Sequence, residues 1–158
     1  MKLPFGLGDM YSRTITGSSD TKYRWNVGWR RKDKTELRVH VFYRGDEDED
    51  PHDHPWDFWT FPLTSYEEEV WLPTETHGVF TYKKQTVKAF RWHYRPATYL
   101  HRVVPWEGSR KIVTLIVASA PFRQWGFWKL VKGYCESDDS TLTQVRGFVY
   151  WRDYLNSK

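Results

Sequence analysis

The sequence has little cysteine and no long apolar segment. Cys135 is the one cysteine among 158 residues, which excludes an internal disulfide and a zinc site built from several thiolates. No segment approaches the roughly 18 consecutive apolar residues of a membrane-spanning helix, and residues 1–6 lack the apolar core of a secretory signal peptide. We therefore expect a soluble protein of the cytoplasm, a reducing compartment.

A long helical pattern is absent as well, whereas aromatic residues make up 18% of the chain. Aromatic and β-branched residues favour strands. Apolar and polar residues alternate in 23–29 and in 37–43, which predicts two half-buried strands. Roughly nine or ten short strands at regular spacing predict an all-β sandwich or barrel. We expect one domain over 1–158, in which residues 1–21, with several glycines and serines, form an irregular lead-in.

The other expected elements follow from the same patterns. Strands are expected at 56–63, 66–72, 99–104, 111–120, 124–128 and 147–151. A hairpin of 78–83 and 86–92 is expected to turn at Lys84 and Gln85. The acidic run 46–50 predicts a loop, because neighbouring like charges repel. A polar loop at 136–144 and one helical turn at 152–155 complete the prediction.

Two histidines one residue apart, His52 and His54, form the first candidate site. Pro51 and Pro55 discourage a helix there, and Pro55 favours an extended conformation for His54. In an extended chain the two imidazoles point the same way, since side chains alternate between faces. Neutral imidazole is a good ligand for transition metals. The pair therefore predicts half of a metal site.

A third histidine, His101, follows about fifty residues later within Pro96-Ala97-Thr98-Tyr99-Leu100-His101. The first histidine pair resembles the first motif of the cupin superfamily, and this second segment resembles the second motif, with Thr98 where the family has glycine. The resemblance is closer to a subfamily of small cupin-like proteins from bacteria and tailed phages. It rests on His52-Asp53-His54-Pro55-Trp56, Tyr66-Glu67-Glu68, Leu100-His101-Arg102-Val103, Trp125-Gly126-Phe127 and Trp151-Arg152-Asp153-Tyr154.

The resemblance implies a double-stranded β-helix with one divalent transition metal, Fe, Mn, Ni or Zn, inside the barrel mouth. The position at which most cupins carry a ligand carboxylate holds Phe58 or Trp59 here. The candidate carboxylates elsewhere in this region are Asp57, Glu67, Glu68 and Glu69. The family pattern selects Glu68, whereas a hairpin turning at residues 64–65 would pair Thr60 with Glu69 and select Glu69. The predicted ligands are His52, His54, Glu68 and His101.

Several further residues are candidates for binding a substrate. Arg102 or Arg91 would orient an anionic group, and Trp56 and Phe58 would line an aromatic barrel. His40 lies on the strand face opposite the apolar residues, so it either serves the site or is exposed. No catalytic residue is assigned from the sequence.

The metal site supports three functional hypotheses. The first is a dioxygenase-type oxidoreductase acting on a small molecule in the barrel. The second is a metal-dependent isomerase, lyase or hydrolase acting on a sugar or a nucleotide. The third is a non-catalytic module that binds a nucleotide or an oligonucleotide, which the net charge of +4 and the abundant aromatic residues would suit. The cupin resemblance also implies a homodimer.

Overall fold

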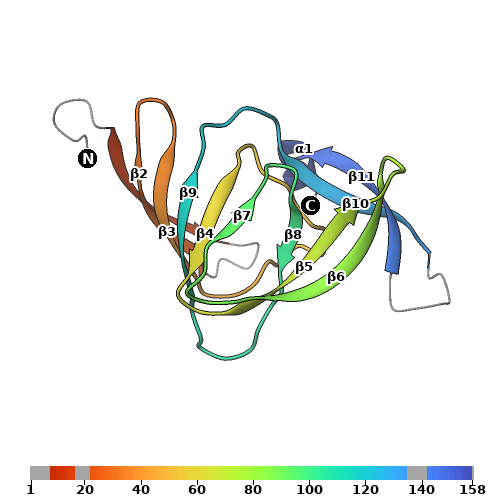
Figure 1. The fold of residues 1–158 in the computed structure, drawn as a ribbon, viewed down its shortest axis with the longest axis horizontal. Coiled ribbons are helices and arrows are strands. Elements are labelled where there is room, and N and C mark those ends of the chain that lie inside the picture. Colours follow the sequence, from red (N-terminus) through yellow and green to blue (C-terminus); the bar gives the residue numbers. More distant parts are fainter. Residues whose placement is uncertain (1–7, 17–21, 135–141, 158) are drawn as a thin grey trace.

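The protein consists of two antiparallel β-sheets that face each other, as the computed structural model in Figure 1 shows. The structure describes residues 8–16, 22–134 and 142–157. The six-stranded sheet has the order β1 (Asp9–Thr16), β2 (Lys22–Arg30), β3 (Glu36–Phe42), β9 (Ile112–Ala118), β4 (Phe58–Pro62) and β7 (His93–Arg95). The five-stranded sheet has the order β10 (Gly126–Tyr134), β11 (Leu142–Tyr150), β6 (Val79–Val87), β5 (Tyr66–Pro73) and β8 (Leu100–Val103).

The all-β prediction is confirmed, and the architecture is a double-stranded β-helix. One short helix, α1 (Trp151–Asn156), falls where a helical turn is expected. The acidic run 46–50 lies outside the strands, also as expected. Within the described residues, no helix is long and apolar enough to cross a membrane.

The irregular lead-in expected at residues 1–21 is wrong for its central part. Residues 9–16 form β1, an edge strand that pairs with β2 from Asp9 opposite Arg30 to Thr16 opposite Lys22. Its sequence carries no clear alternation because most of its side chains are exposed. Residues 1–7 and 17–21 lie outside the described part of the chain.

The hairpin expected around Lys84 and Gln85 is also wrong. β6 continues through both residues and pairs with β5 from Tyr66 opposite Val87 to Pro73 opposite Phe80. The polar residues in β6 do not mark a turn, because Gln85 donates a hydrogen bond to a buried carboxylate on β5. Of the polar loop expected at 136–144, residues 142–144 belong to β11, and 135–141 lie outside the described residues.

β3 turns its polar face toward the interior. Arg38 and His40 are buried, with 9% and 7% of their surface exposed, whereas Leu37 on the opposite face is 49% exposed. β2, on one side of β3, carries the buried Asn26 directly opposite His40. The space between the two sheets is therefore lined in part by polar side chains, which is unusual for a sheet interior.

The two strands that follow the histidine pair lie in different sheets. β4 pairs with β7 and β9, and β5 pairs with β6 and β8. The expected pairing of Thr60 with Glu69 across a turn at 64–65 is therefore wrong. Thr60 and Glu68 both face the interior, with 2% and 0% of their surface exposed.

Candidate metal centre

The segment that carries His52 and His54 is held between the two edge strands of the five-stranded sheet. His52 exchanges backbone hydrogen bonds with His101 on β8, at 3.0 and 3.2 Å. On the other side, Trp128 of β10 donates its backbone N–H to the carbonyl of Pro51 at 2.9 Å. These bonds fix an extended backbone, so the side chains of His52 and His54 point the same way, as the sequence predicts.

Asp53, between the two histidines, points in the opposite direction and anchors the segment. It is 2% exposed and accepts a hydrogen bond from the backbone N–H of Gly126 at 2.8 Å. Its other carboxylate oxygen pairs with Arg123 at 2.9 Å. A charged group bonded this completely holds the backbone of both histidines in place. This role is not among those expected from the sequence, although the alternation of the motif puts Asp53 on the opposite face.

Three imidazoles converge in the space between the sheets. One ligand nitrogen from each of His52, His54 and His101 lies within 4.8 Å of the others. Nε2 of His54 is 3.0 Å from Nε2 of His101. Two nitrogens bound at right angles to one ion, each at about 2.1 Å, would lie roughly 3.0 Å apart. The three predicted histidine ligands are thus brought together at a spacing that suits one transition metal.

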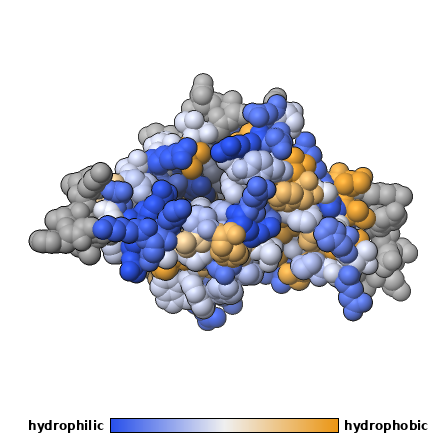
Figure 2. Space-filling model, turned by 90° about the horizontal axis from the view of Figure 1, so that it is seen from above, coloured by the Kyte–Doolittle hydropathy of each residue, from blue (hydrophilic) through white to orange (hydrophobic). Residues whose placement is uncertain are grey.

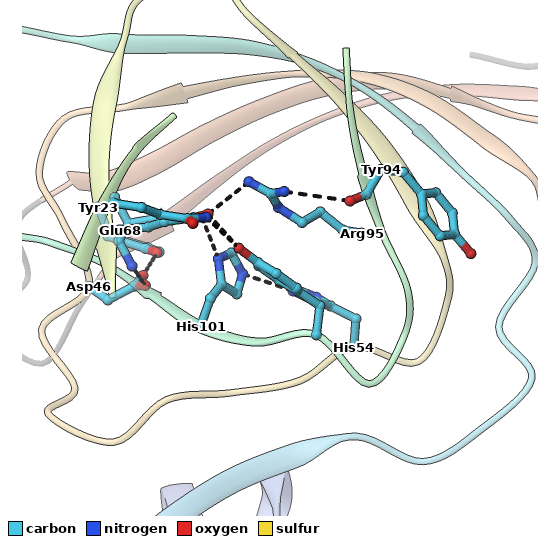
Figure 3. A network of polar contacts seen from close by, with 10 residues as sticks. Tyr23, Asp46, His54, Glu68, Tyr94, Arg95 and His101 are labelled. Atoms are coloured by element: carbon cyan, nitrogen blue, oxygen red, sulfur yellow. Dashed lines mark hydrogen bonds and ion pairs between the residues drawn. The ribbon is translucent and has the colours of Figure 1, made fainter. Parts of the chain in front are cut away.

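Glu68 lies behind His101 rather than among the three imidazoles, at the centre of a hydrogen-bonded network (Figure 3). Nδ1 of His101 is 3.1 Å from Oε2 of Glu68. The other carboxylate oxygen, Oε1, receives hydrogen bonds from Arg95 at 2.7 Å, Gln85 at 2.7 Å and Tyr99 at 2.6 Å. The carboxylate is fully buried and fully bonded, so its direct contacts are with these four side chains.

The charge of Glu68 determines which nitrogen of His101 is free. Burial alone raises the pKa of Glu68, but the hydrogen bond and charge of His101 and the charge of Arg95 outweigh it and lower the pKa to about 2. An ionised carboxylate only accepts hydrogen bonds, so Nδ1 of His101 carries the proton. When His101 acts as a neutral ligand, its lone pair is then on Nε2, the nitrogen that faces His54. A carboxylate behind a histidine in this way is a common arrangement at metal sites.

The imidazoles of His52 and His54 are neutral near pH 7. Burial lowers the pKa of His52 to about 4, and Asp46 opposes this only in part. Burial, followed by the charges of His101 and His52, holds the pKa of His54 well below its usual range. Neutral imidazole is the form that ligates a metal. The donor set therefore fits one divalent transition ion held by three histidines.

The imidazoles face a cavity of about 340 Å³ between the sheets. Three of the four predicted substrate residues, His40, Trp56 and Phe58, line this cavity. Phe58 contacts the ring of His54 edge-on, with ring centres 4.7 Å apart. Figure 2 shows hydrophilic side chains gathered over the end of the molecule where β1, β2 and β3 lie. The lining of the cavity itself is aromatic at Trp56 and Phe58 and polar where β2 and β3 contribute Asn26, Arg38 and His40.

The fourth predicted substrate residue, Arg102, is not part of the cavity lining. It follows His101 on β8, so alternation turns it to the other face, where it donates a hydrogen bond to Glu69 at 2.8 Å. Arg91 is exposed. The remaining candidate carboxylates are also engaged elsewhere: Asp57 accepts from the backbone N–H of Ala97 at 2.6 Å, and Glu67 accepts from Thr86 at 2.6 Å.

The C-terminal motifs of the sequence meet the first histidine in space. The rings of Trp125 and Phe127 lie 6.4 and 5.8 Å from that of His52. Trp151 stacks on Trp125, and Tyr154 stacks on Phe127 at 3.9 Å. Segments that are separated in sequence by about seventy residues or more therefore build one wall around the imidazoles.

Comparisons with known proteins agree with this geometry at the level of the fold. No protein-family model and no curated protein sequence matches the chain. Among solved structures, Fe(II) HppE superposes with a TM-score of 0.51 and 11% identity, covering 75% of this chain and 59% of that one. The chain has a cupin fold. Fe(II) HppE with the alternative substrate (S)-1-HPP superposes with a TM-score of 0.50 and 12% identity, covering 72% of this chain and 56% of that one.

A structure of oxalate decarboxylase superposes with a TM-score of 0.48 and 12% identity, covering 72% of this chain and 29% of that one. The chain spans less than two thirds of the length of the HppE structures. At identities of 11 and 12%, the HppE structures show a shared fold alone, which does not determine function.

Proposed function

We propose that this protein binds one divalent transition ion, Fe, Mn, Ni or Zn, through His52, His54 and His101 and transforms a small molecule held in the cavity. The observation that supports the proposal most strongly is the convergence of three imidazoles on a cavity of about 340 Å³. Glu68 serves in this proposal as the acceptor that orients His101, in place of the ligand role expected from the sequence.

The preferred reaction class is a dioxygenase-type oxidation. When bound, the ion supplies Lewis acidity and open coordination positions for a small molecule. The chain contributes the rest: Glu68 holds the His101 tautomer, and Trp56 and Phe58 exclude water from the space beside the imidazoles. The similar structure of HppE is that of its Fe(II) form, which supports testing iron first.

A metal-dependent lyase, isomerase or hydrolase is the second candidate, and the donor set is the observation that favours it. Three neutral histidines leave the full charge of a divalent ion uncompensated by its protein ligands. This is the donor set with which carbonic anhydrase activates water. Many iron oxygenases instead combine two histidines with a carboxylate.

Metal content and oxygen consumption test these two candidates. If the protein is an oxygenase, the form reconstituted with Fe(II) should consume O₂ when it is given a small organic acid that it converts. Turnover that proceeds equally well without O₂ would favour the second candidate. His77→Ala, which replaces an exposed histidine outside the proposed site, is the control for substitutions of the three ligand histidines and should leave metal content and turnover unchanged. Wild-type protein that retains no ion after reconstitution and desalting would contradict both candidates.

Two finer expectations are retained as proposals. Membership in the bacterial and tailed-phage subfamily is supported by the meeting of its motifs around His52. A homodimer is supported by an apolar row across the outer face of the six-stranded sheet, formed by Leu37, Val117, Trp59 and Tyr94, each 43–49% exposed. Light scattering should give twice the chain mass, and the chain mass alone would contradict the dimer.

A further inference from the structure

We propose that the cavity binds the oxyanion group of a small organic acid between Arg24 and Arg38. The inference rests on the proposed function for the reacting end of this ligand and adds the chemistry of its other end. The two arginines come from β2 and β3, in the six-stranded sheet, whereas His101 comes from the opposite sheet. A ligand between the sheets can therefore contact both groups.

The inner face of β2, β3 and β9 places a row of polar side chains across the cavity. Asn26 lies opposite His40, and His40 lies opposite Thr114. Arg38 is two residues before His40 on the same face, and the strand position opposite it is Gly28. A Cβ added at Gly28 would lie 2.8 Å from the hydroxyl oxygen of Tyr11 and 2.9 Å from the Cβ of Arg38, so glycine here makes room for both side chains.

Polar atoms in this row are buried without hydrogen-bond partners. Native proteins pair nearly all buried polar groups, so each exception needs an explanation. Several exceptions that all line one cavity have one explanation in common, which is a polar ligand. Among the described residues that line the cavity, these atoms include Arg24 Nε, Asn26 Oδ1, Arg38 Nη2, His40 Nε2, Thr60 Oγ1 and Thr114 Oγ1.

The charge of the cavity favours an anion. Its lining includes four arginines, at positions 13, 24, 30 and 38, and two carboxylates, Glu36 and Asp46. Glu36 already pairs with Arg30 and Arg38. Asp46 accepts hydrogen bonds from the hydroxyl of Tyr23 and the backbone N–H of Val103. The site therefore has more positive than negative charge, and an ion on three neutral histidines would add to the excess.

Aromatic rings hold the two guanidinium groups in position. Arg38 lies over Trp56 at 4.5 Å, and Arg24 lies over Phe42 at 5.2 Å. Stacking on the flat face of a guanidinium leaves its N–H edge free to bind an oxyanion. Arg38 is 9% exposed, which makes each such hydrogen bond stronger than at the surface. Phe58 and Ile116 offer an apolar surface for the body of the ligand.

Binding of inorganic phosphate and of acetate to metal-free protein tests the proposal. The use of metal-free protein removes the contribution of the metal. Calorimetric titration at constant ionic strength, set with chloride, keeps general screening the same throughout. Arg24→Gln and Arg38→Gln should each weaken the binding of the preferred anion by about tenfold or more. The matched control is Arg102→Gln, which should bind within about twofold of the wild type because Arg102 pairs with Glu69 outside the cavity.

The outcomes separate this inference from the proposed function. Loss of anion binding in the Arg24 and Arg38 variants, with metal content unchanged, supports the inference, and the tighter of the two anions identifies a phospho or a carboxylate group. Equal affinity in wild type and in R24Q overturns it, as does equal weakening by R102Q. Arg24 is only half-buried, so R24Q decides the question if R38Q does not fold. Arginine-dependent anion binding by a protein that takes up no metal would support this inference and contradict the proposed function.

Discussion

The two walls of the cavity treat buried polar groups in opposite ways. On the five-stranded side, Glu68 is fully buried and accepts hydrogen bonds from four side chains. On the six-stranded side, Arg38, His40 and Thr60 are almost as buried and each has an atom without a partner. A complete network holds its members in one geometry, whereas unpaired groups gain a partner only from a ligand. We infer that the first wall positions the metal ligands and the second binds the substrate.

The largest expected effect comes from removing the centre of the complete network. Glu68→Ala leaves the buried Arg95 without its carboxylate, so the free energy of unfolding should fall by about 3–5 kcal/mol. Metal affinity should fall about 10- to 100-fold because His101 loses its orienting acceptor. Urea denaturation and a metal titration measure the two effects. Glu67→Ala, at the exposed neighbouring position, is the control and should change the stability by less than about 1 kcal/mol.

Acid should destabilise the metal-free protein in two stages. Burial holds the pKa of His52 at about 4, below the usual 6.5, so the unfolded chain binds the proton first as the pH falls. This difference lowers stability by about 3 kcal/mol between pH 6.5 and 4. The pKa of Glu68 is lowered from 4.5 to about 2, so its contribution is lost between these values. Denaturation at a series of pH values measures both stages, and His52→Phe should reduce the first, to which the buried His54 also contributes. A metal-free protein equally stable at pH 7 and pH 5 would contradict this prediction.

The two walls should respond differently when one hydroxyl is removed from each. Tyr99→Phe takes one of the three donors away from Oε1 of Glu68, and should cost about 1 kcal/mol of stability. Thermal unfolding monitored by circular dichroism is sufficient to measure a change of this size. A neutral result would mean that Arg95 and Gln85 alone satisfy this oxygen.

Thr60→Val, on the other wall, should have the smallest effect on stability, either none or an increase of about 1 kcal/mol. The hydroxyl of Thr60 is buried and has no partner, so replacing it with a methyl group removes a cost. The same change should weaken the binding of an oxyanion ligand. A loss of stability comparable to that of Tyr99→Phe would show that the six-stranded wall is also internally paired.

Much of the fold could be predicted from the sequence because alternation records which side chains share a strand face. Alternation does not record which face is turned inward. Leu37 and its apolar neighbours on β3 face outward, and Arg38 and His40 face the cavity, which only the packing of the two sheets decides. β1 gave little signal because an exposed edge strand needs no apolar face.

The histidine cluster could be predicted because extended geometry makes residues two apart point the same way. The choice between Glu68 and Glu69 could not be made from pairing, since the two strands concerned lie in different sheets. The position of Glu68 follows the family pattern, yet its place behind His101 depends on Arg95, Gln85 and Tyr99, which come from three separate segments. Arg24 and Arg38 occupy polar positions in the two alternating segments, so the sequence predicts that both face solvent.

The most direct test of the account is X-ray absorption spectroscopy at the metal edge of the reconstituted protein. The account predicts three imidazole ligands at about 2.0–2.1 Å, and two in His101→Ala. In Glu68→Gln we expect three imidazoles to remain, because the proposed role of the carboxylate is to orient His101 rather than to ligate the metal. A wild-type spectrum without imidazole scattering, or one in which Glu68→Gln removes an oxygen ligand from the metal, would contradict it.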